Sequence, residues 1–243
     1  AVKAEGDIIV NGVVEGATLI SGGNIVLKRG MQGMDRGMLQ AEGNITAKFL
    51  ENCKVRCKGM LKADAILHSD VECQENVDIL GKKGLINGGS LSTYADVHAT
   101  TLGSTMGAST KIKIISDKEL IIRANEIKAE VENKEETLQK IDEVVNRVKG
   151  QLASNQEVLP EQMNYLKQAT VNKPLLVKQI RELREKREKL LVRIEKNKHS
   201  CIRVEGAVYS GIDITVKDVS KVQHEQVSHC RFVRDGADVR IVG

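Results

Sequence analysis

Residues 43–57 read Gly-Asn-Ile-Thr-Ala-Lys-Phe-Leu-Glu-Asn-Cys-Lys-Val-Arg-Cys, a pattern that most clearly indicates the fold of this chain. At its end, Cys53, Val55 and Cys57 alternate with basic residues. Neighbouring side chains of a β-strand point to opposite faces, so the apolar set shares one face and the charged set the other. The stretch therefore predicts a strand with one buried face and one solvated face.

The same pattern recurs through residues 1–115. A glycine directly precedes or opens each of four short runs that begin 16 to 20 residues apart. Short strands at a regular spacing, separated by glycine-containing turns, are typical of the stacked coils of a solenoid. Glycine suits the corners because it adopts positive φ without steric cost. The four runs are residues 7–10, 24–27, 44–47 and 60–63.

The composition agrees with thin repeated layers. Aromatic residues make up only 2% of the 243-residue chain, and tryptophan is absent. A compact core usually buries large aromatic rings, whereas a rung between similar rungs has room only for Val, Ile, Leu, Ala and Cys. Residues 199–243 return to short alternating runs, which we expect to close or extend the solenoid.

The middle of the chain, residues 116–198, has a different period. From Leu120, positions alternately four and three residues apart are apolar except for Lys134, which is typical of a coiled-coil seam. Asp117 is a suitable N-cap, so we expect a helix over about residues 117–153. The seam comprises Leu120, Ala124, Ile127, Val131, Lys134, Leu138, Ile141, Val145, Val148 and Leu152.

A polar break at residues 154–157 separates this helix from a second one. Pro160 fits the first turn of the return helix, and Pro174 is expected to kink or split it. Arms of matched length joined by a short loop predict an antiparallel hairpin. The return seam comprises Leu159, Met163, Leu166, Leu176, Ile180, Leu183, Arg187, Leu190, Ile194 and Asn197.

The sequence thus predicts a mainly β chain with a long α insertion. Residues 1–115 form a parallel β-solenoid, residues 116–198 an antiparallel coiled-coil hairpin with its tip near 154–160, and residues 199–243 strands that complete the solenoid. The chain begins with Ala1 already inside the repeat pattern, so we expect it to be a fragment of a longer protein with a further N-terminal part.

Charge and cysteine content restrict the functional classes. The net charge is +4, and the basic residues are interleaved with acidic ones, which disfavours a nucleic-acid-binding surface. No apolar run approaches the roughly 18 residues that cross a bilayer, so we expect no integral membrane segment. Five cysteines in a chain of this size suggest no disulfide framework and favour a reducing cytoplasm.

Two groups of residues resemble metal ligands, but both have a simpler interpretation. Inward-facing cysteines in a solenoid act as small apolar residues. Adjacent residues such as His229 and Cys230 point to opposite faces of a strand. We therefore predict no metal site and no cofactor. The two groups are Cys53, Cys57 and Cys73, and His199, Cys201, His224, His229 and Cys230.

Catalytic sites are also not indicated. The acidic residues of the solenoid could imitate the active site of a polysaccharide lyase, but the aromatic platforms of sugar sites are missing. The glycine-rich stretches 81–84 and 103–107 lack the phosphate-loop pattern, and hexapeptide acyltransferases have a tighter repeat. We predict no catalytic residue and a solvated polar face. The acids are Asp64, Asp70, Glu72, Glu75 and Asp78. Lys54, Arg56 and Lys58 form a small basic stripe, whose outward charges we expect to be solvated.

Several segments resemble the flagellar assembly protein A family, also called the domain-of-unknown-function family 342. The resemblance covers nearly the whole chain, including its order of β-repeats, coiled coil and β-repeats. It implies a right-handed parallel β-helix, a bacterial cytoplasmic protein and an association with flagellation or motility. The segments are residues 30–33 with Gly37, 41–52, 81–89, 102–104 and 204–214.

We therefore expect a non-enzymatic scaffold that binds cytoplasmic protein partners through a solenoid face, the hairpin or both, and regulates flagellar assembly. Homo-oligomers, and recruitment to the cell pole or the flagellar site, are compatible with this role. The sequence does not define the partner-binding residues. One alternative is a self-assembling, bactofilin-like cytoskeletal solenoid. Another is a β-helix enzyme that acts on polysaccharide.

Overall fold

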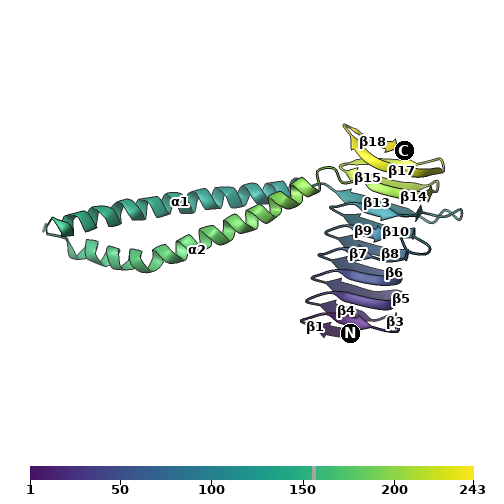
Figure 1. Cartoon of the computed structure of the whole chain (residues 1–243), viewed down its shortest axis with the longest axis horizontal. Helices are drawn as coiled ribbons and strands as arrows, with labels where there is room; N and C mark the ends of the chain where they lie inside the picture. Colours follow the sequence, from purple (N-terminus) through teal and green to yellow (C-terminus); the bar gives the residue numbers. More distant parts are fainter. Residues whose placement is uncertain (155–156) are drawn as a thin grey trace. The chain divides into compact units, whose positions relative to one another are not determined.

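The computed structural model describes residues 1–154 and 157–243. Within these residues the chain forms 18 strands and two helices. They divide into two compact units, each visible in Figure 1: a solenoid unit, Ala1–Asp117 with Lys196–Gly243, and a hairpin unit, Lys118–Glu195. The prediction of a mainly β solenoid with a two-helix insertion is confirmed.

Short strands make up the solenoid unit. Those before the helices are β1 Val2–Ala4, β2 Ile8–Val10, β3 Val13–Glu15, β4 Thr18–Ser21, β5 Ile25–Ala41, β6 Ile45–Cys57, β7 Leu61–Lys62, β8 Ala65–Cys73, β9 Val77–Ile79, β10 Leu85–Thr93, β11 Val97–Ala99, β12 Thr101–Leu102 and β13 Thr110–Ile115. Those after the helices are β14 Ile202–Val208, β15 Ile212–Lys217, β16 Val219–Gln223, β17 Val227–Asp235 and β18 Asp238–Val242.

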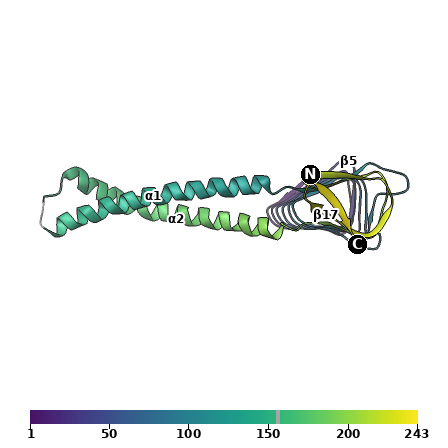
Figure 2. The same ribbon diagram turned by 90° about the horizontal axis from the view of Figure 1, so that it is seen from above.

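Strands β1–β15 stack in three parallel, in-register columns, which we call faces A, B and C. Viewed along the stack, the coils superimpose on one another (Figure 2). Face A contains β2, the starts of β5 and β6, β7, β9, β11 and the start of β14. One buried aliphatic residue from each coil forms its inner ladder. This ladder comprises Ile8, Ile25, Ile45, Leu61, Val77, Val97 and Ile202.

Faces B and C repeat the arrangement. Face B contains β3, the middles of β5 and β6, the starts of β8 and β10, β12 and the end of β14. Face C contains β1, β4, the ends of β5, β6, β8 and β10, then β13 and β15. Their buried ladders are Val14, Met31, Leu50, Ile66, Ile86, Leu102 and Val208, and Leu19, Leu39, Val55, Val71, Leu91, Ile112 and Ile214.

The C-terminal strands only partly continue this stack. β14 and β15 extend it in parallel, but β16 pairs antiparallel with β15, β17 with β14 and β18 with β17. Tight reversals allow this change, with Lys217 and Gly236 at positive φ in the turns. Residues 199–243 were expected to close or extend the solenoid: β14 and β15 extend it, and β16–β18 cover the last coil. Phe232 on β17 is the largest fully buried side chain among those described.

The hairpin unit contains α1 Lys118–Ala153 and α2 Pro160–Lys196. Contacts between the arms show that they run antiparallel, because Lys134 Nζ bonds to Gln179 Oε1 at 3.2 Å and Asp142, further along α1, pairs with Lys173. The tip expected near residues 154–160 falls partly on 155–156, which lie outside the described residues. The apolar core of the hairpin comprises Ile127, Val131 and Ile180, packed with Leu138, Leu176, Leu183 and Leu190.

Pro174 was expected to kink or split the return helix. α2 is not split at Pro174 but continues through it. Pro174 is exposed, so water can solvate the carbonyl that loses its helical partner. The seam is also not buried over its whole length, since Leu152, Leu159 and Met163 near the far end of the arms are exposed. The apolar cluster between the described parts of the arms lies in the half that carries Ile127 and Ile180, while Val148 and Ala169 are buried in the other half.

Gly150 gives a direct test of helix stability in the hairpin. It lies in α1, is exposed, and a Cβ added to it meets nothing within 4 Å. Gly150→Ala should stabilise the helix by about 1 kcal/mol, because alanine loses less backbone entropy on folding. Thermal melting followed by far-UV circular dichroism should show a higher transition for the hairpin. A lower transition would contradict the exposed helical environment.

A matched control comes from a glycine that cannot accept a side chain. Gly89 has φ +83°, and an added Cβ would lie 2.3 Å from the carbonyl oxygen of Ser69. Gly89→Ala should therefore destabilise the solenoid unit, since both the backbone conformation and the close approach oppose a methyl group.

Candidate functional site

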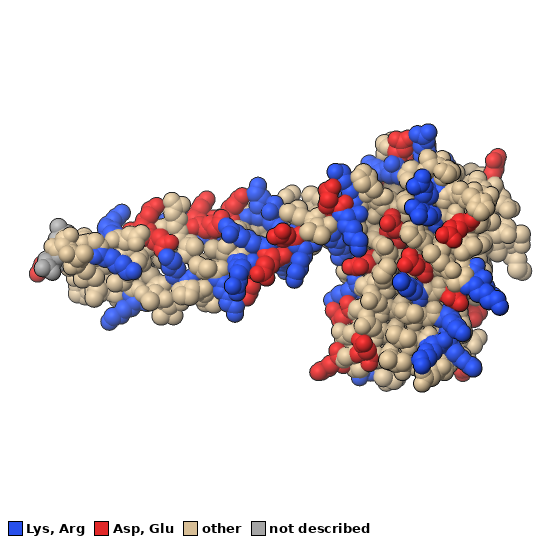
Figure 3. All heavy atoms as spheres, viewed as in Figure 1, with Lys and Arg blue, Asp and Glu red and all other residues tan. Residues whose placement is uncertain are grey.

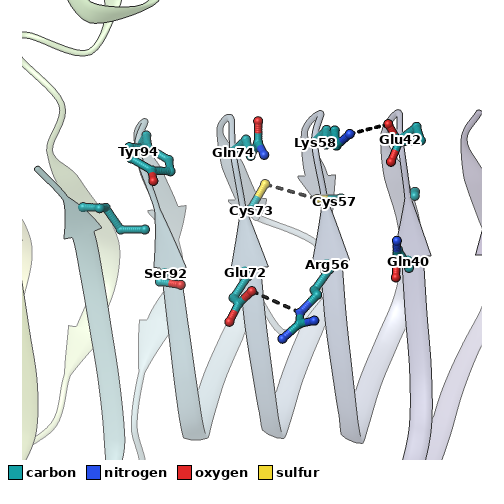
Figure 4. A pocket seen from close by; sticks show the side chains of 12 residues that line it. Gln40, Glu42, Arg56, Cys57, Lys58, Glu72, Cys73, Gln74, Ser92 and Tyr94 are labelled. Carbon is teal, nitrogen blue, oxygen red and sulfur yellow. Dashed lines mark hydrogen bonds and ion pairs between the residues drawn. The ribbon is translucent and has the colours of Figure 1, made fainter. Parts of the chain in front are cut away.

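A shallow hollow of about 390 Å³ lies on face C and continues over the corner that follows it; we call it the face-C groove. Figure 4 shows the residues of the groove in two rows, one along the strands and one along the corner, and each coil contributes one side chain to each row. Cys57 and Cys73 lie beneath the polar rows. The strand row contains Gln40, Arg56, Glu72 and Ser92, and the corner row contains Glu42, Lys58, Gln74 and Tyr94.

The rows result from the coil period. Arg56 and Glu72 are in-register partners on β6 and β8, so their outward side chains are neighbours although they are 16 positions apart. Arg56 Nε lies 3.1 Å from Glu72 Oε2, and Lys58 Nζ forms an ion pair with Glu42. Both pairs are about half exposed, so each contributes at most about 1 kcal/mol. Their main effect is to balance the charge of the groove.

This pairing places acidic residues next to the small basic stripe of Lys54, Arg56 and Lys58. Arg56 and Lys58 are each paired with an acid from an adjacent coil, and Lys54 lies in register with Asp70. Across the visible face of each unit, Lys and Arg side chains are interspersed with Asp and Glu (Figure 3). The groove therefore presents paired charges of both signs.

The cysteines of β6 and β8 form a close pair rather than a trio. Cys57 Sγ donates a hydrogen bond to Cys73 Sγ at 3.2 Å, and both thiols are free. Cys53 lies at another position of β6, with its sulfur 3.6 Å from Ser69 Oγ. Burial raises the pKa of the Cys53 thiol. The hydrogen bond from Cys57 lowers the pKa of Cys73, and the same bond together with burial raises that of Cys57.

The second group of metal-like residues is scattered. Cys201 donates its backbone N–H to Asp96 Oδ1 at 2.8 Å, while Cys230 pairs with Val204 in the β14–β17 ladder. Burial raises the pKa of both thiols. Within residues 1–154 and 157–243, no group of three or more His, Cys, Asp or Glu side chains is arranged to hold a metal ion.

The acids considered as catalytic groups also divide among different places. On face C, Asp70 accepts a hydrogen bond from Ser90 Oγ at 2.8 Å. On face A, Asp78 lies 3.3 Å from His98 Nδ1. Glu75 at the corner lies 3.9 Å from Lys196 Nζ. The structure does bring Asp64 and Asp78 to one shallow hollow, which Leu80 and Gly81 also line.

The two glycine-rich stretches form bends of the solenoid. Gly84, Gly103 and Gly107 have positive φ, as expected for corners. Residues of both stretches, including Lys83 and Ser104, line one open hollow of about 330 Å³. Neither stretch leads directly into a helix, so the arrangement lacks the helix N-terminus that accompanies a phosphate loop.

Sequence reasoning missed a polar ladder at the corner before face A. Asp7 Oδ1 accepts the backbone N–H of Asn24 at 2.6 Å, and Asn24 Oδ1 accepts that of Asn44 at 2.8 Å. Asn44 Oδ1 in turn accepts the N–H of Met60 at 2.7 Å. The signal was the Asp or Asn residue at the start of the first three runs, aligned at the coil period. These side chains satisfy corner amides and so serve the fold.

The hairpin carries an apolar surface that the seam pattern did not reveal. Val171 is 74% exposed and Leu175, one turn later on α2, is 57% exposed. They lie on a different side of α2 from its buried Ala169 and Ile180. We call Val171 and Leu175 the outer hairpin surface. Apolar residues outside the seam positions were the available signal, because such positions on a solvated helix are usually polar.

These features define a class: a β-solenoid with an inserted helical hairpin, shallow charge-balanced grooves and exposed apolar helix positions. Among the described helices, none combines the length and apolar character needed to cross a membrane. The chain belongs to the flagellar assembly protein A family, since the family model described as the Flagellar Assembly Protein A beta solenoid domain matches residues 1–239. Comparisons with curated proteins and with solved structures found no match.

Proposed function

We propose that this chain is a non-enzymatic scaffold that regulates flagellar assembly by binding a cytoplasmic protein partner. The observation that carries the proposal is the outer hairpin surface, Val171 and Leu175, on a chain of the flagellar assembly protein A family. Apolar side chains one turn apart on a helix are the usual anchors for a docked helix or groove. Exposed apolar side chains lower the solubility of a protein, and burial against a partner would remove that disadvantage.

The grooves of the solenoid support binding more than catalysis. In the face-C groove the carboxylate of Glu72 contacts Arg56, and on face A the carboxylate of Asp78 contacts His98. Each carboxylate thus already has a basic partner. Charge-balanced, open surfaces suit recognition of another protein, in which polar groups set specificity. A solenoid presents such rows at a fixed spacing on a rigid support.

Self-assembly by stacking of coils receives less support. Head-to-tail stacking needs an unpaired strand edge on the last coil. In this chain β17 pairs antiparallel with β14, and β16 pairs antiparallel with β15. The C-terminal strands therefore occupy the edges on which a further parallel coil would be placed.

The test uses the full-length protein in a bacterial host whose own copy of the gene has been deleted. The double variant Val171→Glu and Leu175→Glu should reduce the number of flagella per cell to that of the deletion strain. Two charges on the outer hairpin surface would prevent burial against a partner. Flagella are counted by electron microscopy, with protein abundance measured in the same cells.

The matched control is the double variant Asn133→Glu and Thr137→Glu on α1. It adds the same charge at two exposed polar positions one turn apart on the other helix of the hairpin, and it should leave the count unchanged. A photo-crosslinking residue at position 175 should label a defined protein in the host, and one at position 133 on α1 should not. Wild-type flagellation by the Val171 and Leu175 variant would exclude this surface as the binding site.

A further inference from the structure

One inward position at the end of face C carries a hydrogen-bond donor in several coils. Ser21 Oγ donates to the carbonyl of Gly6 at 2.8 Å, and Thr93 Oγ1 donates to that of Glu75. Cys73 Sγ makes the equivalent bond to the carbonyl of Gly59 at 3.0 Å. A small hydroxyl is therefore sufficient to satisfy this corner. Consecutive cysteines at this position add something that the fold does not require.

What they add is a pair of sulfur atoms in contact. Cys57 and Cys73 are in-register partners on parallel strands β6 and β8, and their Sγ atoms are 3.2 Å apart. Neighbouring strands lie about 4.8 Å apart, which falls within the Cα separation that a disulfide tolerates. Side-chain rotation with a small strand adjustment is then enough to bring the two sulfurs to bonding distance.

The pair is also reachable by a small molecule. Both cysteines line the face-C groove, although only 4% of Cys57 and 2% of Cys73 is exposed. Restricted access of this kind admits hydrogen peroxide more readily than a bulky disulfide. Cys53, Cys201 and Cys230 do not line this groove.

Within the pair, the hydrogen bond makes the two thiols unequal. The hydrogen bond donated by Cys57 favours the thiolate of Cys73 and so lowers its pKa, while Cys57 keeps its proton. A thiolate is the form that attacks an oxidant, and an adjacent thiol is what resolves the product. The hydrogen bond from Cys57 favours Cys73 as the sulfur oxidised first and Cys57, 3.2 Å away, as the resolving sulfur.

We propose that Cys57 and Cys73 form a reversible redox modification site in which hydrogen peroxide joins two successive coils through a disulfide. The Cys73 thiolate attacks peroxide and breaks the O–O bond, giving a sulfenic acid and hydroxide, which takes a proton to become water. The Cys57 sulfur then attacks the sulfenic sulfur, loses its proton and expels a second water molecule. In total, two thiols and one peroxide give one disulfide and two waters.

The test treats the full chain with hydrogen peroxide and measures intact mass and free thiols. We expect the mass to fall by two hydrogen atoms, and the thiols titrated after denaturation to fall from the five free cysteines to three. Peptide mapping should find Cys57 linked to Cys73, and dithiothreitol should restore both. Mapping on the unmodified sequence keeps the test independent of any variant.

Matched variants separate this pair from the other cysteines. Cys57→Ser and Cys73→Ser should fold, because Ser21 fills the equivalent position, but neither should lose two hydrogens on oxidation. Cys53→Ser should still form the bond. The proposal is overturned if oxidation only adds oxygen to Cys73, if the disulfide links other cysteines, or if both thiols remain free at peroxide concentrations that oxidise an exposed cysteine peptide.

Discussion

Val55→Asp is expected to unfold the solenoid unit. Val55 is 0% exposed and lies between Leu39 and Val71 in the inner ladder of face C. The surrounding ladder is aliphatic, so a carboxylate there would be buried without a charged or hydrogen-bonding partner. That burial costs several kcal/mol, in addition to the roughly 2 kcal/mol lost with the valine side chain. Domains are stable by only about 5–15 kcal/mol in total.

The effect should spread beyond one coil, because each coil is packed only on its neighbours and a break removes contacts on both sides. Chemical denaturation followed by circular dichroism should show loss of the β signal at low denaturant, and limited proteolysis should cleave within residues 1–115. Lys54→Gln is the control. Lys54 is exposed on the same strand, and its replacement should change stability by no more than about 0.5 kcal/mol. Equal stability of the two variants would contradict the inward assignment of Val55.

The repeating part of the fold was predictable because it depends on local sequence. The alternation through Cys53, Val55 and Cys57 sets which side chains face inward, and the glycine spacing sets the coil length. Both the alternation and the glycine spacing can be detected in a single sequence, because each depends on residues that are close along the chain. The ladders through Val55 and Ile45 follow from them directly.

The antiparallel reversal after β15 carries no comparable signal. β16 and β17 alternate much as the parallel strands do, and alternation indicates a strand without indicating its direction. Direction depends on the turn, here at Lys217, whose positive φ is unusual for a residue with a long side chain. The sequence therefore predicted strands in residues 199–243 but not how they pair.

The site was harder to predict because it joins residues from different coils. Arg56 and Glu72 meet only if exactly one coil of 16 residues separates them, and other coils are longer by a few residues. The hairpin has a similar limit. Its seam pattern identified Ile127 and Ile180 as core positions, but the exposure of Leu159 depends on how closely the arms approach each other. A single-helix period contains no information on that distance.

Ile127→Asp is expected to melt the hairpin unit while the solenoid unit stays folded. Ile127 is 1% exposed and belongs to the small apolar cluster with Val131 and Ile180. Because so few residues form this cluster, loss of one aliphatic side chain and burial of a charge should exceed the stability that the hairpin gains from it. Isolated helices of this kind depend on tertiary packing, so both arms should lose helical structure together.

The independence of the two units follows from their cores. The buried cluster of the solenoid and that of the hairpin share no residue among those described. Circular dichroism of Ile127→Asp should therefore show a large loss of helical signal with the β signal retained, and proteolysis should cleave only within residues 118–196. Asn125→Asp adds the same charge at an exposed position of the same turn and should change little. If Ile127→Asp also unfolded the solenoid, the two units would not be independent. The hairpin would then be part of the solenoid's folding unit, and the β-fold would require it.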